Sequence, residues 1–400
     1  MKVLVINCGS SSIKYRLFEM PEEKLLAEGL LERIGKEDSR LIHNTDKGKY
    51  NINKPVKNHK EGLKLIIDVL SDEKIGVVKD IAEIKAVGHR VVHGGESFSG
   101  SMVITPEVIK TIKEYFDLAP LHNPPNLAGI KASMEELPKV INVGCFDTAF
   151  HQTIPEVAYL YALPFEFYKK YRIRRYGFHG ISHRYVARRF AQLIKRHKYK
   201  VNCITIHLGN GCSITAVKDG RSVDTSMGLT PLEGLVMGTR CGDIDPAIIF
   251  YLADKKMTFD EINQLLNKKS GLLGLSGISN DVRDLIKRKE KGNKMAKLAL
   301  DIFAYRVKKY IGSYLAALGK CDAIIFTGGI GENAHSLRDE ICSGLETLGI
   351  KLDKVKNKKT VGRKEGDISK RDSKIKIFVI PTNEEIGIAR DTYQLVQGRK

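Results

Sequence analysis

The chain has 400 residues, which is more than one ordinary hydrophobic core accommodates and indicates two domains. Hydrophobic residues make up 42% and charged residues 28% of the chain, a globular composition that excludes disorder. The 66 Lys and Arg exceed the 47 Asp and Glu, and the net charge of +19 suggests an anionic partner or substrate. No apolar run approaches the about 18 residues of a membrane span, and the N-terminal apolar run is too short for a signal peptide.

The basic excess lies in two segments. Residues 169–200 contain 12 Lys and Arg and no acidic residue, and residues 351–376 contain 11 against 4 acidic residues. The rest of the chain is balanced. A nucleic-acid or membrane surface is one interpretation, but no stacking aromatic residues are spaced along the first segment as in an RNA-binding module. We therefore expect a solvated surface, with no nucleic-acid partner and no membrane partner.

The chain has seven cysteines, an odd number, and no C-x-x-C motif. Cys203, His207 and Cys212 lie close together but lack a second ligand pair, which argues against a zinc site. We expect reduced, mostly buried thiols and a cytoplasmic protein.

A strand, a Gly-rich turn and a second strand are predicted twice, half a chain length apart. The first copy is Lys2–Ile6, Asn7–Ser12 and Ile13–Phe18, and the second is Val201–Ile206, His207–Gly211 and Ser213–Val217. In this alignment Gly9 corresponds to Gly209, and Ser12-Ile13 to Ser213-Ile214. The repeat suggests an ancient duplication of one α/β domain.

The later elements alternate between helix and strand. Ser182 is predicted to cap a helix that ends near Lys195, and residues 294–318 have long helical periodicity. The remaining predicted elements are a strand at Asp322–Thr327, the Gly-rich stretch Gly328–Gly331 followed by a helix, a last strand at Ile375–Ile380, and a terminal helix opening at Thr382–Glu385. Such alternation is typical of an α/β fold with mostly parallel sheets.

Three Gly-rich turns follow apolar strands, at Asn7–Ser12, Gly209–Gly211 and Gly328–Asn333. Turns of small residues let backbone N–H groups approach a phosphate. None has the spacing of a P-loop or of a dinucleotide-binding motif. Lys14 follows the first turn, where it either reaches a phosphate or lies on the solvent face of an edge strand.

Two arginines occupy unusual settings. Arg90 lies inside a β-branched strand, and Arg240 lies in a Gly-rich loop. Each requires an anionic partner, which is either a nearby Asp or a substrate carboxylate or phosphate. Asp147 ends an apolar segment between aromatic residues, and His179 lies between glycines, a setting that indicates a loop at a site.

Together these motifs resemble the acetate kinase (acetokinase) family of the actin, sugar-kinase and heat-shock-ATPase superfamily. The resemblance runs from Val3 to Thr392. The matching segments are Asn7–Lys14 (NCGSSSIK), Gly88–Gly95 (GHRVVHGG), Ala119–Pro124 (APLHNP), Phe146–His151 (FDTAFH), Arg174–His183 (RRYGFHGISH), Asp224–Gly228 (DTSMG), Thr230–Gly234 (TPLEG), Met237–Arg240 (MGTR), Thr327–Asn333 (TGGIGEN) and Pro381–Glu385 (PTNEE).

The resemblance implies reversible phosphoryl transfer, in which ATP and acetate give ADP and acetyl phosphate. Arg90 and Arg240 would hold the carboxylate and the transferring phosphoryl group, His179 would hydrogen-bond to that group, and Asp147 would lie near the carboxylate. Val92, Leu121, Phe178 and Pro231 would line the methyl pocket with Arg90 at the substrate, and Asn7 and Glu384 would position Mg²⁺, with Mn²⁺ as an alternative metal. Lys14, His207, Leu208, Gly209, Asn210, Gly211, Asp281, Val282, Arg283, Gly329, Ile330, Gly331, Glu332 and Asn333 would hold ATP.

The implied architecture is two duplicated actin-like, ribonuclease H-like domains with a central cleft between them. The N-terminal acetokinase domain would comprise residues 1–150 and, with the terminal helix packing back, 384–400. The C-terminal nucleotide-binding domain would comprise residues 151–383. The resemblance also implies a homodimer. Cys8 and Cys241 stand where the family usually has other residues, which places two thiols beside phosphate loops as an oxidation liability; Cys212 also departs from the usual pattern, and a nucleotide contact of Asn280 is left open.

Two other functions stay open beside acetate kinase and nucleic-acid binding. A propionate, butyrate or broad short-chain acyl kinase would use the same site, because one methylene changes binding by only about 1–3 kcal/mol. An ATP-driven switch of the chaperone or actin type would share the duplicated fold and hydrolyse ATP without acetate.

Overall fold

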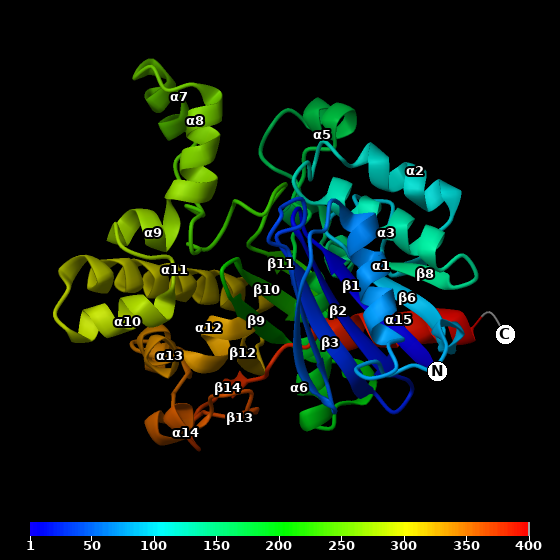
Figure 1. The fold of residues 1–400 in the computed structure, drawn as a ribbon. Coiled ribbons are helices and arrows are strands. Elements are labelled where there is room, and N and C mark those ends of the chain that lie inside the picture. Colours follow the sequence, from blue (N-terminus) through cyan, green and yellow to red (C-terminus); the bar gives the residue numbers. More distant parts are fainter. Residues whose placement is uncertain (399–400) are drawn as a thin grey trace. The chain divides into compact units, whose positions relative to one another are not determined.

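The computed structural model describes residues 1–398 and divides into two compact units. Unit 1 comprises Met1–Gln152 and the chain from Asn383 onward, and unit 2 comprises Thr153–Thr382 (Figure 1). Each unit contains one β-sheet covered by helices. Within residues 1–398, no helix combines the length and the apolar character needed to cross a bilayer.

Unit 1 contains an eight-stranded sheet with strand order β5-β4-β3-β2-β1-β6-β8-β7. Its strands are β1 (Lys2–Cys8), β2 (Ser12–Glu19), β3 (Lys24–Glu32), β4 (Arg40–Thr45), β5 (Gly48–Asn53), β6 (Ile84–Val91), β7 (Met102–Val103) and β8 (Ile141–Phe146). Its helices are α1 (His59–Leu70), α2 (Pro106–Glu114), α3 (Asn123–Glu136) and α15 (Glu384–Gln397).

Unit 2 contains a six-stranded sheet with strand order β11-β10-β9-β12-β14-β13. Its strands are β9 (Cys203–Leu208), β10 (Cys212–Lys218), β11 (Arg221–Thr225), β12 (Ala323–Thr327), β13 (Gly366–Asp367) and β14 (Lys376–Val379). Its helices are α4 (Glu156–Tyr159), α5 (Phe165–Tyr171), α6 (Gly180–Leu193), α7 (Ala247–Asp254), α8 (Phe259–Gln264), α9 (Gly271–Ser276), α10 (Val282–Glu290), α11 (Lys294–Leu318), α12 (Gly328–Asn333), α13 (His335–Cys342) and α14 (Lys354–Lys359).

The two sheets share a five-stranded core of the same topology. In unit 1, β3, β2 and β1 are antiparallel neighbours, and β1, β6 and β8 are parallel. In unit 2, β11, β10 and β9 are antiparallel, and β9, β12 and β14 are parallel. This identity of order and direction confirms the duplication that the two strand–turn–strand motifs predict.

The two copies differ in the length of their first hairpin. The last pair before the turn is Cys8 with Ile13 in unit 1 and Leu208 with Cys212 in unit 2. The turn in unit 2 is therefore one residue shorter. Counted from these closing pairs, Ile13 corresponds to Cys212, so the sequence alignment of Ile13 with Ile214 is wrong by two residues.

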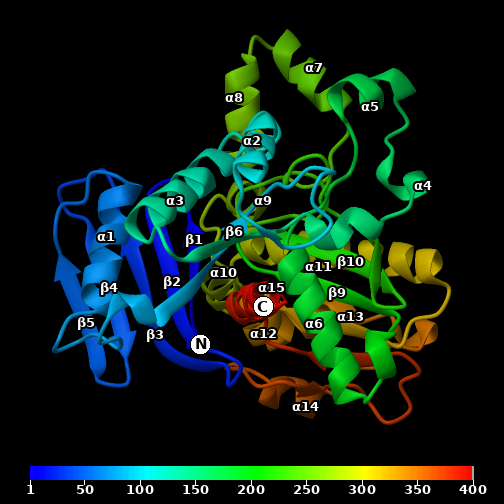
Figure 2. The same cartoon turned by 90° about the vertical axis from the view of Figure 1, so that its right-hand side faces the viewer.

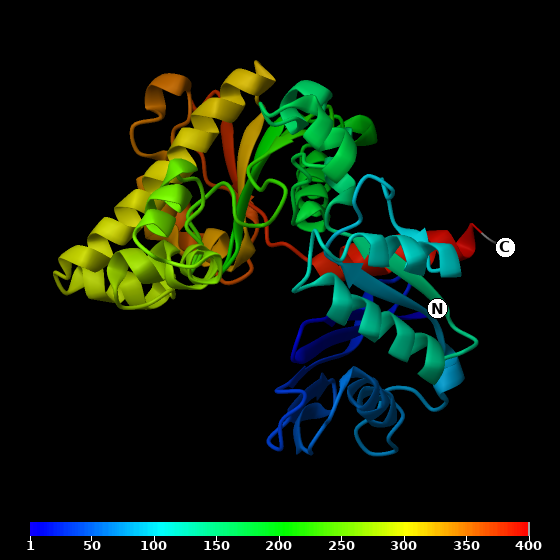
Figure 3. The same ribbon diagram turned by 90° about the horizontal axis from the view of Figure 1, so that it is seen from above.

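Helices cover both faces of each sheet. In unit 1, α1 and α3 pack on one face, and α15 packs on β1, β6 and β8 (Figure 2). Gly88 in β6 permits the close approach of α15, because an added Cβ would lie 2.4 Å from Thr392 Oγ1 and 2.6 Å from Ile388 Cγ2. In unit 2, α6 and α11 lie on opposite sides of the strands (Figure 3).

The residues that the motifs single out lie at the carboxyl ends of the parallel strands. Ligands of α/β sheets bind outside this edge, where the strand ends and their loops converge. In unit 1, Asn7 lies near the end of β1, Arg90 near the end of β6, and Asp147 directly after β8. In unit 2, the Gly209–Gly211 turn follows β9 and Gly328 follows β12.

Two predicted boundaries are wrong. Helix α6 begins at Gly180 with His179 at its N-cap position, three residues before the predicted cap at Ser182. Gly328–Asn333 is the short helix α12 instead of a turn. Gly328 makes this possible because its φ of +76° turns the chain directly from β12 into the helix, beneath the Leu208 carbonyl.

The core of unit 1 makes its stability sensitive to acid. His89 in β6 is 2% exposed, hydrogen-bonds through Nε2 to Asn142 Oδ1 at 2.8 Å, and has its pKa lowered by burial to about 4. Unfolding therefore takes up a proton between pH 6.5 and pH 4, so the free energy of unfolding falls as the pH falls through that window. We predict that lowering the pH from 7 to 5 removes about 2 kcal/mol through this group. Urea denaturation at both pH values checks this, and an equal loss in the His89→Gln variant would contradict it.

Candidate active site

A bidentate ion pair lies at the strand ends of unit 1. Arg90 Nε lies 3.0 Å from Asp147 Oδ1 and 3.2 Å from Oδ2, and Arg90 Nη2 lies 2.7 Å from Oδ2. β6 and β8 are hydrogen-bonded neighbours, so Arg90 and Asp147 emerge side by side. Asp147 is buried, whereas Arg90 keeps 21% of its side-chain surface exposed. The guanidinium is thus oriented by Asp147 and remains accessible to a second anion.

The electrostatics of this pair follow from burial and contact. Burial raises the pKa of the Asp147 carboxyl, and the Arg90 guanidinium in direct contact opposes that rise. The pKa of Arg90 is raised by Asp147 and by Glu384, against the opposing effect of its burial. A bidentate contact of this kind keeps both groups ionised at neutral pH.

Helix α15 brings a second acidic group to Arg90. Glu384 is the first residue of α15, and its Oε2 lies 3.7 Å from Arg90 Nε. The start of α15 is held by Asn383, which caps Ile386 N–H at 3.1 Å, and by Glu385, which is paired with Lys14 and Arg16. Lys14, predicted at ATP, is paired with Glu385 in the structure. An amide oxygen at Asn7 and a carboxylate at Glu384 are oxygen donors of the type that Mg²⁺ prefers.

Two of the predicted methyl-pocket residues belong to unit 1. Val92 directly follows β6 and donates its backbone N–H to Asn126 Oδ1 at 3.0 Å. Leu121 precedes α3 and has 68% of its surface exposed. An apolar side chain so exposed is free to contact a ligand, and the structure leaves its role as a prediction.

His179 in unit 2 is held in an uncommon backbone conformation. Its φ of 55° places it in the left-handed region, which turns the chain into α6. Its ring stacks on His207 with centroids 4.3 Å apart, and its Nδ1 shares a 2.9 Å hydrogen bond with Ser213 Oγ. Ser213 Oγ also contacts His183 Nε2 at 2.7 Å, so this network fixes the His179 ring.

Arg240 lies beside His179. A Cβ added at Gly211 would lie 3.4 Å from His179 Cε1 and 3.5 Å from Arg240 Nη1. Both side chains therefore contact the turn after β9 at a position that has no side chain. Arg240 Nη1 donates to the Pro231 carbonyl at 3.1 Å and contacts Met237 Sδ at 3.6 Å.

The charge of Arg240 is not compensated. Among the residues of unit 2, Thr153–Thr382, no carboxylate lies within ion-pair distance of its guanidinium, and its burial lowers its pKa. A partly buried guanidinium without a counter-charge is an anion-binding group.

A cavity of about 550 Å³ lies next to this region in unit 2. It is lined by Gly209, Asn210, Asn280, Asp281, Val282, Arg283, Ile286, Gly329, Ile330, Asn333 and Ala334. Eight of these are residues predicted to hold ATP, and Asn280, whose contact was left open, joins them through a 3.3 Å hydrogen bond to Asn210. The mixture of glycine backbone, amides and apolar side chains suits a nucleotide.

Other predicted nucleotide residues lie outside this cavity. Leu208 and Gly331 are buried, and Glu332 is a buried carboxylate whose Oε1 accepts from Thr382 N–H at 3.1 Å. His207 faces His179, and Lys14 belongs to unit 1. Phe178 is buried in unit 2, and Pro231 is half-buried there.

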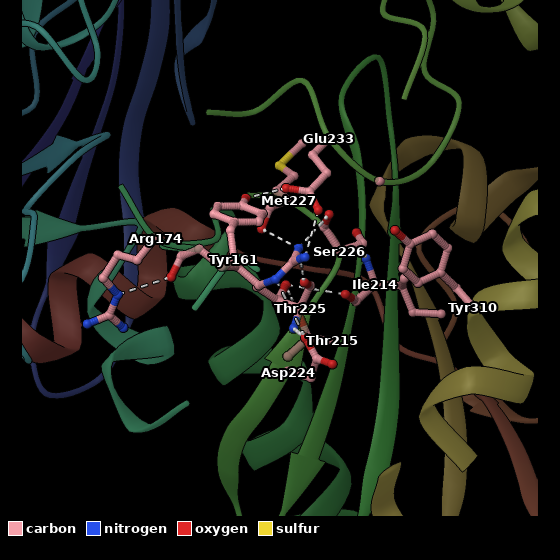
Figure 4. Close-up of polar contacts among 12 residues, drawn as sticks. Tyr161, Arg174, Ile214, Thr215, Asp224, Thr225, Ser226, Met227, Glu233 and Tyr310 are labelled. Atoms are coloured by element: carbon pink, nitrogen blue, oxygen red, sulfur yellow. Dashed lines mark hydrogen bonds and ion pairs between the residues drawn. The ribbon is translucent and has the colours of Figure 1, made fainter. Parts of the chain in front are cut away.

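The structure also shows positioning residues that the motifs do not reveal. Arg338 in α13 is buried and donates to the Gly331 carbonyl at 2.7 Å, which secures α12. Arg175 donates to the carbonyls of Thr225, Ser226 and Met227 in unit 2. Figure 4 labels these three acceptor residues. The contacts of Arg175 join residues 50 to 52 positions apart, and that of Arg338 joins residues 7 positions apart. The only local signal was the Arg174-Arg175 pair, which the sequence assigned to solvated surface.

The thiols near the loops have raised pKa values. Burial raises the pKa of Cys8 and of Cys212 to about 12, and it also raises the pKa of the partly exposed Cys241. A thiol with a raised pKa holds little of the thiolate that oxidants attack. The raised pKa values argue against the oxidation liability expected at Cys8 and Cys241, which stays a prediction.

A model of the acetokinase family matches residues 2–390. The chain belongs to the acetokinase family. The acetate kinase of Thermotoga petrophila is 58% identical over 399 residues, which cover 99% of each chain, and that of Thermoanaerobacter pseudethanolicus is 57% identical over the full length of both. Among solved structures, Porphyromonas gingivalis acetate kinase is 48% identical with a TM-score of 0.95, and covers 99% of both chains. A propionate kinase from Francisella tularensis is 44% identical with a TM-score of 0.91, over 98% of this chain and 99% of its own.

Membership of the acetokinase family confirms the predicted fold, in which two copies of an actin-like α/β domain form one chain. It also confirms that this acetokinase is a kinase, and it argues against the nucleic-acid and switch interpretations. The central cleft and the roles of individual residues stay predictions.

Proposed function

We propose that this acetokinase transfers the γ-phosphoryl group of ATP reversibly to acetate and forms acetyl phosphate and ADP. Its family and the acetate kinases to which it is 55–58% identical support this substrate. The observation that carries the proposal is Arg240, a partly buried guanidinium beside His179 with no carboxylate of unit 2 in ion-pair reach. Such a guanidinium can bind the negative charge of an incoming substrate.

In the proposed reaction, a carboxylate oxygen of acetate forms a bond to the γ-phosphorus as the bond to the bridging oxygen of ADP breaks. The transferring group carries its charge on three equatorial oxygens, so fixed donors supply most of the catalysis. Arg240 and His179 would donate to these oxygens. Arg90, oriented by Asp147 yet still exposed on one side, would hold the acetate carboxylate.

The role of Asp147 follows from its contacts. Acetate is already ionised at neutral pH and needs no general base. Both Asp147 oxygens accept from Arg90, which occupies the positions that a proton carrier would need. Asp147 therefore orients Arg90.

A divalent metal fits the acidic end of unit 1. Within residues 1–398, no group of three or more His, Cys, Asp or Glu could hold a metal alone. Mg²⁺ commonly takes one or two protein ligands and completes its shell with water and phosphate oxygens. Asn7 and Glu384 offer such ligands, with Mn²⁺ as the alternative ion. The metal would neutralise charge on the phosphates of ATP.

The acceptor is acetate rather than propionate in this proposal. Curated relatives at 58% identity carry the name acetate kinase, and the propionate kinase is 44% identical. The cavity lined by Asn210, Val282 and Ile330 would hold the nucleotide. Seven free cysteines support a cytoplasmic setting, where thiols stay reduced.

We also propose a homodimer. Large apolar side chains are exposed on short helices of unit 2, among them Val157 on α4, Phe165 on α5, Phe250 and Tyr251 on α7, and Phe259 on α8. Exposed apolar surface of this extent favours a partner. Light scattering should give a mass twice the 44.7 kDa of one chain, and replacement of Phe250 and Phe259 by Lys should give one chain mass. A wild-type mass of 44.7 kDa would refute the dimer.

The assay that tests the function is acetyl phosphate formation from ATP, Mg²⁺ and a set of short-chain acids. We predict that acetate is the preferred acid, and that Arg240→Met and Arg90→Ala each reduce kcat by about 10² to 10³-fold, or about 3–4 kcal/mol, because each removes a donor to transition-state charge.

Stability separates the two arginines. Arg240→Met removes an uncompensated charge and should leave the free energy of unfolding unchanged or higher. Arg90→Ala leaves Asp147 buried without its partner and should lower it by about 3 kcal/mol or more. Arg189→Met, at the surface pair with Glu365, is the matched control and should retain full activity. ATP hydrolysis that does not require any acid, with no acetyl phosphate formed, would sink the proposed function.

The orienting role of Asp147 gives a separate prediction. Asp147→Asn keeps one oxygen acceptor for Arg90 and should retain more activity than Asp147→Ala, with an unchanged pH profile of kcat. A base role predicts instead that Asn and Ala are equally inactive and that the acidic limb of the profile disappears. Steady-state rates between pH 5 and pH 9 separate the two.

A further inference from the structure

Arg175 hydrogen-bonds to both ends of one loop in unit 2, and we call this set of contacts the clasp. The proposed reaction does not use the clasp directly. Its Nη1 donates to the carbonyls of Thr225 at 2.9 Å, Ser226 at 3.2 Å and Met227 at 3.4 Å. Its Nη2 donates to Glu233 Oε1 at 2.6 Å. Figure 4 shows these groups converging from the end of β11 and from the loop that follows it.

The clasp grips both ends of one short segment. Thr225–Met227 lies before residues 228–232, and Glu233 lies after them. Tyr161 Oη also hydrogen-bonds to Glu233 and accepts the Leu229 N–H at 3.0 Å. The segment packs closely, because a Cβ at Gly228 would lie 1.8 Å from Glu233 Oε2 and 2.2 Å from Tyr161 Oη.

The segment between these ends carries a contact to the reacting group. Pro231, near its middle, accepts from Arg240 Nη1 at 3.1 Å. Two contacts hold the Arg240 guanidinium: this hydrogen bond to a carbonyl oxygen, and the contact with Met237 Sδ. Any displacement of Pro231 therefore displaces the guanidinium, and it also alters the predicted methyl pocket.

The polar environment of the clasp makes it rigid. Arg175 keeps 17% of its side-chain surface exposed and Glu233 keeps 31%. Glu233 raises the pKa of Arg175 against the effect of burial, and burial raises the pKa of Tyr161. The planar guanidinium satisfies four acceptors at once, which a lysine ammonium cannot do with the same geometry.

We propose that Arg175 is a positioning residue for phosphoryl transfer: it fixes residues 225–233 so that the Pro231 carbonyl aims Arg240 at the transferring phosphoryl group. This rests on the proposed function for the reaction itself. Arg175 touches neither substrate, and its effect passes through Glu233 and Pro231 to Arg240.

The test compares Arg175→Lys and Arg175→Met with wild type in the acetyl phosphate assay. Arg175→Lys keeps the charge opposite Glu233 but loses the fork to the carbonyls, so it should fold. We expect kcat to fall about tenfold to a hundredfold, because small misplacements of a catalytic group have effects of that size. The KM for ATP should change less than about twofold, because other residues line the nucleotide cavity. Arg189→Met is again the matched control.

A double-mutant cycle separates positioning from a merely structural role. If Arg175 acts through Arg240, then Arg175→Lys should lower kcat less than about threefold further in the Arg240→Met background. An equal fold-loss in both backgrounds, or an unchanged kcat in Arg175→Lys, would overturn the proposal. Loss of soluble folded protein in Arg175→Met alone would not support it, since that variant reports stability.

Hydrogen exchange reports on the clasp without measuring enzyme activity, so it tests this proposal separately from the proposed function. Hydrogen exchange over residues 225–240 should become faster in Arg175→Lys and stay at the wild-type rate in Arg189→Met. Wild-type protein that makes no acetyl phosphate would refute the proposed function, while unchanged exchange in Arg175→Lys would refute the clasp.

Discussion

The free-energy cost of holding a guanidinium out of water governs both halves of the candidate site. Arg90 meets that cost with a carboxylate of its own chain, in a bidentate pair with Asp147. Arg240 meets it with one carbonyl and a thioether, and no carboxylate of unit 2 lies within ion-pair reach. The first arginine is therefore fixed before any ligand binds, and the second gains most from an incoming anion. This asymmetry supports the proposal that Arg90 orients the acceptor and that Arg240 stabilises the transferring charge.

The duplicated fold supplies equivalent positions, and the two copies use them differently. Asn7 and His207 precede the first turn by the same number of residues, and their antiparallel partners are Lys14 and Ser213. In unit 1 these positions present an amide and a cation, whereas in unit 2 they present the imidazole and hydroxyl that support His179. The strand beside them carries Arg90 as its next-to-last residue in one copy and ends with Thr327, followed directly by Gly328, in the other. The same edge thus presents charged side chains in one unit and a glycine turn in the other.

The sequence predicted features that depend on neighbouring residues and missed those that depend on distant ones. The helix at 294–318 and the strand ends at 6–8 and 327 follow from local periodicity, and the duplication follows from two matching motifs. Arg90 was correctly expected to need an anion, but its partner could not be read from spacing because Asp147 lies on another strand. The cap of α6 was misassigned because His179 adopts a left-handed backbone conformation within a hydrogen-bonded ring network, whereas Ser is the residue type that the capping preference favours. Arg175 and Arg338 were missed for a similar reason: most of their acceptors are backbone carbonyls, which leave no signature in sequence.

The net charge of +19 is explained in a different way from its first interpretation. Most cations of residues 351–376 are exposed, as are Lys195, Arg196 and Lys198 in the first segment, and these form solvated surface. Arg174 and Arg175 do not. Arg174 is buried with its guanidinium 3.5 Å from the Tyr159 ring centroid, and Arg175 grips the loop of Arg240. The basic residues at 169–200 therefore have two physical roles: the exposed cations form solvated surface, and Arg174 and Arg175 form contacts within unit 2. Only the interactions of the exposed cations depend strongly on salt concentration. Screening by ions weakens interactions between exposed charges at distances beyond about 10 Å, whereas a guanidinium with four hydrogen-bond acceptors in a partly buried site is screened far less. Raising the ionic strength should then weaken any steering of ATP toward the protein while leaving the geometry of the transferring site intact.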